Sequence, residues 1–170
     1  QWLERGVVCD GETFSWADRP TEQRPPAEIA LVAGTVTEIH PQAEAFVRSL
    51  AERLQRGAAF FIDYGFPEAE YYHLADADPL VHVGEKDITS HVNFSAIALA
   101  GQDAGLQVLG YASQARFLLN CGLLDLLQGA DIRQVAMAKK LIAEHEMGEL
   151  FKVLAFVKGD DFGAIGFTAG

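Results

Sequence analysis

The sequence predicts an α/β fold, because a clear helical pattern leads directly into an apolar run of the kind that forms buried strands. Residues 41–56 carry apolar side chains at three- and four-residue spacing, which is typical of a helix with one buried face. Gly57 follows, and residues 58–62 are continuously apolar. Such a run predicts a strand buried on both faces, as in parallel sheets. A helix joined to a buried strand by a short glycine turn is half of a β–α–β unit.

The composition allows one ordinary hydrophobic core, since 49% of the 170 residues are hydrophobic and 22% are charged. The net charge of −11 argues against nucleic acid as a partner, because binding phosphates requires Lys and Arg. No apolar run reaches the length of a membrane span, and the first residues lack the pattern of a secretory signal. Cys9 and Cys121 match no metal or redox spacing, which favours a reducing compartment, either the cytoplasm or an organelle matrix.

The beginning of the chain is expected to be a hairpin and a surface loop. Residues 6–9 and 13–16 are short β-prone runs on either side of a glycine turn. Residues 18–28 are polar and rich in proline, which is typical of an exposed connection. We therefore divide the chain into an inserted hairpin and loop, residues 1–40, and a main domain, residues 41–170.

The rest of the main domain predicts alternating helices and strands. Asn93 and Ser113 are good helix N-caps, and Cys121 is expected to face the core at the end of a short helix. Helices are expected at residues 93–104, 113–122 and 131–146, and strands at residues 106–111, 150–158 and 164–168.

Asp63, Tyr64 and Gly65 follow the first apolar run, and Gly65 can turn the backbone where other residues cannot. Parallel α/β sheets bind ligands beyond the carboxyl ends of their strands. Asp63 and Tyr64 are therefore the first candidates for chemistry. A structural alternative makes Asp63 a cap on the following turn and Tyr64 a packing residue.

Five segments of the chain, taken in order, resemble the MidA family of S-adenosylmethionine-dependent methyltransferases, whose mitochondrial members methylate an arginine of a complex I subunit during assembly. They are residues 37–46 (TEIHPQAEAF), 60–67 (FFIDYGFP), 87–97 (DITSHVNFSAI), 114–125 (QARFLLNCGLLD) and 146–156 (EMGELFKVLAF). The resemblance implies a Rossmann-like class I methyltransferase fold, of which this chain supplies the C-terminal portion of the sheet with its flanking helices. It also implies S-adenosylmethionine as cofactor, a protein arginine as substrate, and a bacterial cytoplasmic or mitochondrial matrix location.

The chain departs from the family pattern in two places. It contains neither the glycine-rich S-adenosylmethionine motif nor the Asn-Glu pair that precede these segments in the family. We therefore expect the cofactor-binding residues to lie outside this chain, and the apolar patch left by the missing half to drive formation of a homodimer. The segment at residues 71–79 is shorter than in the family, which predicts missing residues between His73 and Leu74.

The resemblance assigns site roles to seven residues. Asp63 would orient a guanidinium through charge-assisted hydrogen bonds, and His91 would bond the substrate or move a proton. Structural roles stay open beside these, namely interaction with a helix dipole for Glu38, helix capping for Asp87 and backbone bonding for Gln114. The catalytic candidates are Asp63, Tyr64 and His91, and the substrate-binding candidates are Glu38, Gly65, Asp87 and Gln114.

Two other functional classes remain. The first is a metal-dependent hydrolase, because histidine and carboxylate side chains between residues 73 and 91 suit zinc, iron or manganese. These are His73, Asp76, Asp78, His82, Asp87 and His91. No two of these histidines have the HxxxH spacing of a helical metal site, so we expect no metal. The second is a non-catalytic assembly or binding protein that keeps the methyltransferase-like fold.

Overall fold

A computed structural model describes residues 1–25, 34–67, 78–85, 87, 90–159 and 163–168 of the chain. Contacts between Cα atoms divide the chain into two compact units. The first unit comprises Gln1–Ile39 and Tyr72–Ser90, and the second comprises His40–Tyr71 and His91–Gly170. Among the described residues, no helix is long and apolar enough to cross a membrane.

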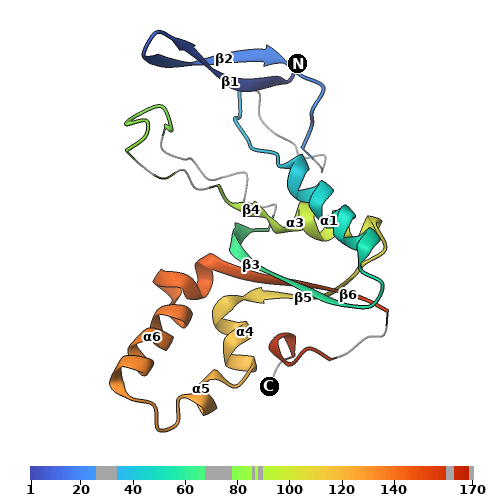
Figure 1. Ribbon diagram of the computed structural model, residues 1–170, viewed down its shortest axis with the longest axis vertical. Helices are drawn as coiled ribbons and strands as arrows, with labels where there is room; N and C mark the ends of the chain where they lie inside the picture. The colour runs from blue at the N-terminus through green and yellow to red at the C-terminus, as the bar shows by residue number, and fades with distance from the viewer. Residues whose placement is uncertain (26–33, 68–77, 86, 88–89, 160–162, 169–170) are drawn as a thin grey trace. The chain divides into compact units, whose positions relative to one another are not determined.

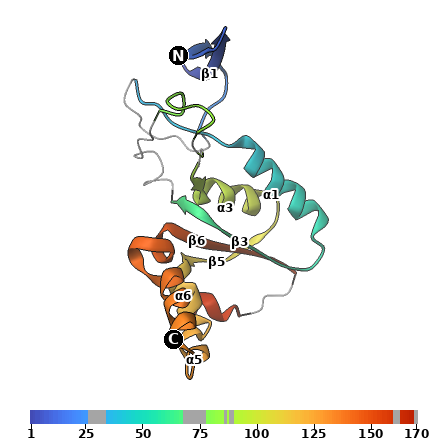
Figure 2. The ribbon, with the colours of Figure 1, turned by 60° about the vertical axis from the view of Figure 1, so that its left-hand side comes forward.

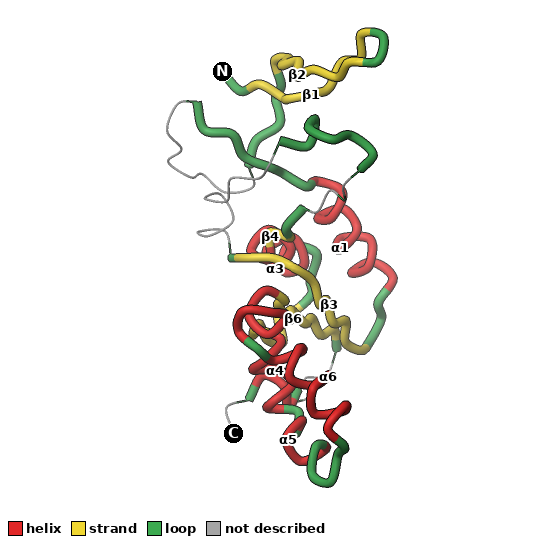
Figure 3. The backbone as a smooth tube through the Cα atoms, turned by 90° about the vertical axis from the view of Figure 1, so that its left-hand side faces the viewer, coloured by secondary structure: helices red, strands yellow, loops and turns green. Residues whose placement is uncertain are grey.

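The first unit contains the predicted hairpin, which is longer at both ends than the sequence indicates. Strand β1 (Leu3–Asp10) pairs antiparallel with β2 (Thr13–Pro20) along its whole length (Figures 1 and 3). Oppositely charged side chains stand across from each other in this ladder. Arg5 Nε lies 3.0 Å from Asp18 Oδ1, and Arg19 Nη2 lies 2.9 Å from Glu4 Oε2.

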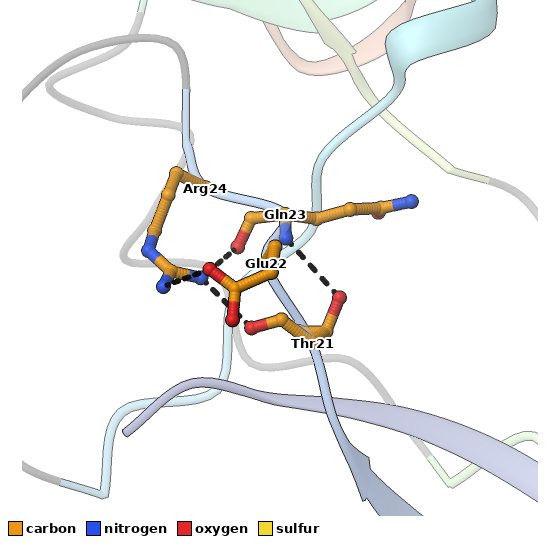
Figure 4. A network of polar contacts seen from close by, with 4 residues as sticks. All are labelled: Thr21, Glu22, Gln23 and Arg24. Atoms are coloured by element: carbon orange, nitrogen blue, oxygen red, sulfur yellow. Dashed lines mark hydrogen bonds and ion pairs between the residues drawn. The ribbon is translucent and has the colours of Figure 1, made fainter.

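Polar contacts fix the open end of the hairpin. The backbone N–H of Thr21 donates to the carbonyl oxygen of Trp2 at 3.2 Å. Arg24 folds back and donates from Nη1 to the carbonyl oxygens of Thr21 and Gln23, at 2.9 and 2.7 Å (Figure 4). Its Nη2 lies 3.5 Å from Glu22 Oε2, and its guanidinium carbon lies 5.9 Å from the centre of the Trp2 ring. The hairpin is therefore held at both ends, by its turn and by Arg24.

The second unit is built around a four-stranded mixed sheet with the order β4-β3-β6-β5 (Figure 1). These strands are β4 (Val92–Asn93), β3 (Gly57–Phe66), β6 (Phe151–Lys158) and β5 (Gln107–Ser113). The last strand in the sequence, β6, lies between β3 and β5 and runs antiparallel to both. The two neighbours of β6, β3 and β5, are thus parallel to each other without being paired.

The prediction that residues 58–62 form a strand buried on both faces of a parallel sheet was wrong. On β3, Phe60 and Ile62 remain 44% and 53% exposed. The fully buried strand is β6, in which every residue from 153 to 157 is at most 2% exposed. The physical reason is position: β6 is paired along both edges, whereas the described part of the chain pairs β3 along one edge and only at Gly65 and Phe66 on the other.

Helices cover both faces of this sheet (Figures 2 and 3). Helices α1 (Pro41–Arg53) and α3 (Phe94–Asp103) pack on one face, where they enclose a core with Leu154 and Phe156 of β6. The other face carries α4 (Gln114–Asn120), α5 (Leu123–Leu126) and α6 (Ile132–Ile142). Each face of β6 therefore contacts a helical layer, which explains its burial.

Local capping chemistry is confirmed at two predicted helix starts. The side chain of Asn93 accepts a hydrogen bond from Ala96 N at 3.0 Å, and that of Ser113 accepts one from Arg116 N at 3.4 Å. These bonds satisfy backbone donors that have no partner inside the helix. The prediction that Cys121 faces the core was wrong, since Cys121 is exposed.

The predicted strand at residues 164–168 was also wrong. Ile165–Phe167 forms a single 3₁₀ turn, η2. Its Phe167 ring packs 5.1 Å from the Phe117 ring and is stacked 6.3 Å from Phe60, measured between ring centres. A β-carbon at Gly166 would overlap the Phe117 ring, so the turn lies directly against α4. Aromatic packing on the sheet face therefore takes the place of a further strand.

The helix expected over residues 131–146 ends early. Helix α6 stops at Ile142, and a π-helical turn, η1 (Glu144–Gly148), follows it. Glu146 has non-helical backbone angles, with φ −116° and ψ −115°, which breaks the helical path before β6. A side chain at Gly148 would overlap the carbonyl group of Ile142, so only glycine allows this tight return.

Candidate active site

The predicted site residues Asp63 and Tyr64 lie within β3, not beyond it. The ladder between β3 and β6 continues through Asp63, which is in register with Lys152, and Tyr64, which is in register with Phe151. The prediction that the strand ends at residue 62 was therefore wrong. Because successive side chains of a strand alternate between faces, Asp63 and Tyr64 point to opposite faces of the sheet.

Asp63 stands beside a lysine that the sequence interpretation missed. The Asp63 side chain is exposed, and its Oδ1 accepts a hydrogen bond from the Tyr64 N–H at 2.8 Å. Lys152 is in register with both Asp63 on β3 and Ser113 on β5, so the three residues form a row across the sheet. The Lys152 side chain is only 14% exposed, and its Nζ lies 3.4 Å from Glu149 Oε2. A lysine at the second position of a strand that is otherwise apolar up to Lys158 was the signal that could have identified it.

Tyr64 belongs to a group of four partly buried rings at the carboxyl end of β3. Its ring is tilted by 41° against that of Phe151, with 3.9 Å between the ring centres. Phe66 follows two residues later on the same face of β3, and its ring lies 5.1 Å from that of His91, tilted by 49°. We call Tyr64, Phe66, His91 and Phe151 the ring group.

Parallel pairing between β3 and β4 brings His91 to this position. Gly65 is in register with Val92, so His91 comes one residue before the ladder begins. Gly65 is buried, and a β-carbon there would overlap the carbonyl oxygen of Val92 and lie 2.6 Å from the Phe94 ring. Gly65 therefore allows the close approach that places His91 beside β3.

The other predicted substrate-binding residues occupy different surroundings. Glu38 and Asp87 are exposed residues of the first unit, where Glu38 Oε2 accepts a hydrogen bond from Ser90 Oγ at 3.0 Å. This bond joins the TEIH and DITSH segments, which are 52 residues apart. Gln114, in the second unit, is 7% exposed and donates from Nε2 to the Leu141 carbonyl oxygen at 2.9 Å. It thereby links the start of α4 to the end of α6, and its proposed contact with substrate remains a prediction.

A metal site finds no support in the described part of the chain. His73 and Asp76, like the suspected gap before Leu74, lie outside the described residues. Within the residues that are described, no group of three or more His, Cys, Asp or Glu side chains could hold a metal ion.

A match to a sequence family identifies the chain. Residues 1–112 match a family described as "Putative S-adenosyl-L-methionine-dependent methyltransferase". The chain belongs to this methyltransferase family. A search of curated proteins found no match.

Two solved structures from Burkholderia thailandensis are similar to this methyltransferase-family chain. Both belong to the COG1565 superfamily, with 47% sequence identity and a TM-score of 0.86 over 99% of this chain. One is a native structure, and the other is bound to S-adenosyl-homocysteine. The chain covers 52% of the first and 50% of the second, and so spans about half the length of the structures it matches.

Among the described residues, no glycine-rich turn joins a strand to a helix. Rossmann-like sheets hold their cofactors with a glycine-rich turn between a strand and a helix. In the described residues, β5 passes directly into α4 through Ser113 and Gln114. Gly65 packs against the Val92 carbonyl oxygen and the Phe94 ring, which leaves no room for a ligand there. A carboxylate and four rings at the end of β3 are instead groups that recognise a cation.

Proposed function

We propose that this chain forms the acceptor side of a Rossmann-like class I methyltransferase of the MidA type. The protein would methylate an arginine side chain of a protein that is assembled into a respiratory complex, in the bacterial cytoplasm or the mitochondrial matrix. Family membership and the likeness to a structure with bound S-adenosyl-homocysteine support the reaction class. The parallel direction of β3 and β5 supports the fold, since such strands are joined by helical crossovers.

The observation that carries the acceptor assignment is the position of an exposed carboxylate next to the ring group in the sequence of one strand, near its carboxyl end. Asp63 lies on one face of β3 and Tyr64 on the other, both within the last four residues of the strand. A guanidinium placed at the carboxyl end of β3 would reach side chains from both faces. Asp63 would bind it through charge-assisted hydrogen bonds, and the ring faces would attract its positive charge.

S-adenosylmethionine supplies the methyl group when it is bound. The residues of this chain would orient the acceptor nitrogen for in-line attack, which requires alignment rather than a covalent intermediate. Methylation of a guanidinium nitrogen releases one proton. His91 is the member of the ring group that would take up this proton, and Tyr64 would limit access of water to the same nitrogen.

Titration of the full-length protein with S-adenosylmethionine tests the reaction class. We expect saturable binding heat, followed by transfer of a labelled methyl group to an arginine that mass spectrometry identifies in the acceptor protein. Absence of cofactor binding would contradict the enzyme assignment. Retained acceptor binding without cofactor binding would instead favour a non-catalytic assembly protein.

The variant Asp63→Asn tests the acceptor role. We expect cofactor affinity to be unchanged and kcat/KM for the acceptor to fall by about 10- to 100-fold, as for loss of a hydrogen bond to a charged group. The matched control is Asp103→Asn, which changes an exposed carboxylate at the far end of α3. Equal turnover in both variants would disprove the role of Asp63.

A further inference from the structure

A lysine stands in the middle of the polar row that crosses the end of the sheet. Lys152 of β6 is in register with Asp63 of β3 on one side and with Ser113 of β5 on the other. Residues in register project from the same face of a sheet, so the three side chains share one face. Leu154 follows two residues later on that face and belongs to the core that α1 and α3 enclose. Lys152 therefore lies at the margin of this core.

The Lys152 ammonium is paired with a carboxylate, but not with the one in register. Its side chain is only 14% exposed, and a charge so far removed from water requires a partner. Within the residues that the structure describes, this partner is Glu149, whose Oε2 lies 3.4 Å from Nζ, and no ion pair joins Lys152 to Asp63. Glu149 lies between the η1 turn and the start of β6. The ammonium is thus held at the entry to β6.

A second carboxylate lies within reach of the same lysine. Residues directly opposite each other in an antiparallel ladder have β-carbons about 4.5–5.5 Å apart. The four-carbon stem of a lysine is long enough to carry its ammonium from Lys152 to the Asp63 carboxylate. Asp63 and Glu149 therefore compete for one ammonium. The carboxylate that does not hold it is left to bind another cation.

We propose that Glu149 and Lys152 set the charge preference of the acceptor site. By holding the ammonium, Glu149 prevents Lys152 from neutralising Asp63, and Asp63 stays available for a cationic acceptor. Two carboxylates and one ammonium together leave a single negative charge, which matches the single positive charge of a guanidinium. This inference rests on the proposed function, in which Asp63 binds the acceptor. It adds two residues that determine specificity through a competing internal cation.

Removal of Glu149 should redirect the lysine. In Glu149→Gln the ammonium loses its partner, and because an unpaired charge at the margin of the core is costly, it should pair with Asp63 instead. An acceptor cation must then displace Lys152, so cation binding weakens. Adding Lys152→Met removes the competitor and should restore cation binding. A purely structural role of Glu149 would not produce this rescue.

NMR titration of the full-length protein, without S-adenosylmethionine, measures the charge preference. The probes are N-acetyl-arginine amide and N-acetyl-citrulline amide, which are similar in shape but differ in charge. We expect the wild-type protein to bind the arginine probe more tightly. Glu149→Gln should weaken arginine binding by about 10-fold, as for loss of a bond to a charged group, and leave citrulline binding unchanged. The double variant Glu149→Gln/Lys152→Met should return to the wild-type preference.

Glu144→Gln is the matched control, because it removes the same charge from the preceding η1 turn and should leave the preference unchanged. Glu149→Asp retains the carboxylate and should keep most of the preference, which keeps the test decisive if the double variant does not fold. Equal effects of Glu149→Gln and Glu144→Gln would overturn the inference. Absence of rescue in a folded double variant, or a wild-type protein without preference for arginine, would also overturn it.

Failure of this inference is distinguishable from failure of the proposed function. Methyl transfer to arginine that continues while Glu149→Gln and Glu144→Gln bind the two probes equally well would count against the inference alone. Absence of cofactor binding would contradict the enzyme assignment. In that case an arginine preference that depends on Glu149 and is rescued by Lys152→Met would still support the inference.

Discussion

Gly65 controls the closest approach between β3 and the start of α3. A β-carbon there would overlap the Val92 carbonyl oxygen, which belongs to the backbone and cannot move aside. We expect Gly65→Ala to lower the free energy of unfolding by about 1–3 kcal/mol, as for other overpacked sites. Urea unfolding followed by circular dichroism measures this change. The control Gly163→Ala meets no atom within 4 Å, and an equal loss in that variant would contradict the packing argument.

Asp18 gives the hairpin a pH dependence. Its side-chain hydrogen bond with Arg5, helped by the opposite charge, lowers the pKa of the Asp18 carboxyl below its ordinary value. A lowered folded-state pKa contributes stability above the unfolded-state pKa, and this contribution disappears as the pH falls through the folded-state pKa. We expect the Trp16 indole resonance to shift over that acidic range, because Arg5 lies over this ring.

The variant Asp18→Asn should remove this acid-induced shift, whereas Asp10→Asn, at the hairpin turn, should preserve it. Persistence of the Trp16 shift in Asp18→Asn would assign the titration to another group. High salt should reduce the effect, since the pair is exposed and screened by ions.

At the level of single elements, β6 holds the second unit together. Its Phe156 is fully buried, and the Phe61 ring stands 6.0 Å away between ring centres. We expect Phe156→Ala to destabilise the protein by about 3–5 kcal/mol, through lost burial and a new cavity. Phe46 is a matched control, because its ring also packs edge-on against Phe61, at 6.3 Å, while remaining 60% exposed. Phe46→Ala should cost less than about 1.5 kcal/mol, and similar losses for both would contradict a core centred on β6.

The start of α6 depends on a reciprocal cap. Asp131 Oδ1 accepts from Gln134 N, and Gln134 Oε1 accepts from Asp131 N, both at 2.9 Å. We expect Asp131→Ala to reduce stability by about 1 kcal/mol, while Asp131→Asn keeps most of it. Thermal unfolding of the two variants measures the difference. A larger loss for Asn than for Ala would show that the charge, not the cap, matters.

At the scale of the whole chain, 24 acidic against 13 basic residues would, under the proposed function, attract a basic acceptor segment. Attraction between exposed charges weakens as salt shortens the Debye length to about 10 Å at 0.1 M. Under the proposed function, KM for an arginine-containing basic peptide should rise several-fold between low and high salt. Affinity for S-adenosylmethionine should change much less. A salt-independent KM would mean that the net charge does not assist acceptor binding.

The sequence predicted the strand that carries Asp63 and Tyr64 more successfully than the surroundings of these two residues. Asp63 and Tyr64 do lie at the carboxyl end of a strand, and their positions follow from a local run of apolar residues. Lys152 and Phe151 could not be placed beside them in advance, because that requires the register between β3 and β6. Backbone hydrogen bonds look alike in every register, so only packing of the side chains against the helices selects one.

The sequence by itself determined the local features of this protein. Helical periodicity gave α1, and short-range polar bonding gave the caps at Asn93 and Ser113. Tertiary structure alone decided that β6 enters between β3 and β5, that Asp63 and Tyr64 face opposite ways, and that Ile165–Phe167 forms a turn rather than a strand. Local features depend on neighbours within a few residues. Strand order depends on which distant apolar surfaces bury each other best, and no short stretch of sequence contains that comparison.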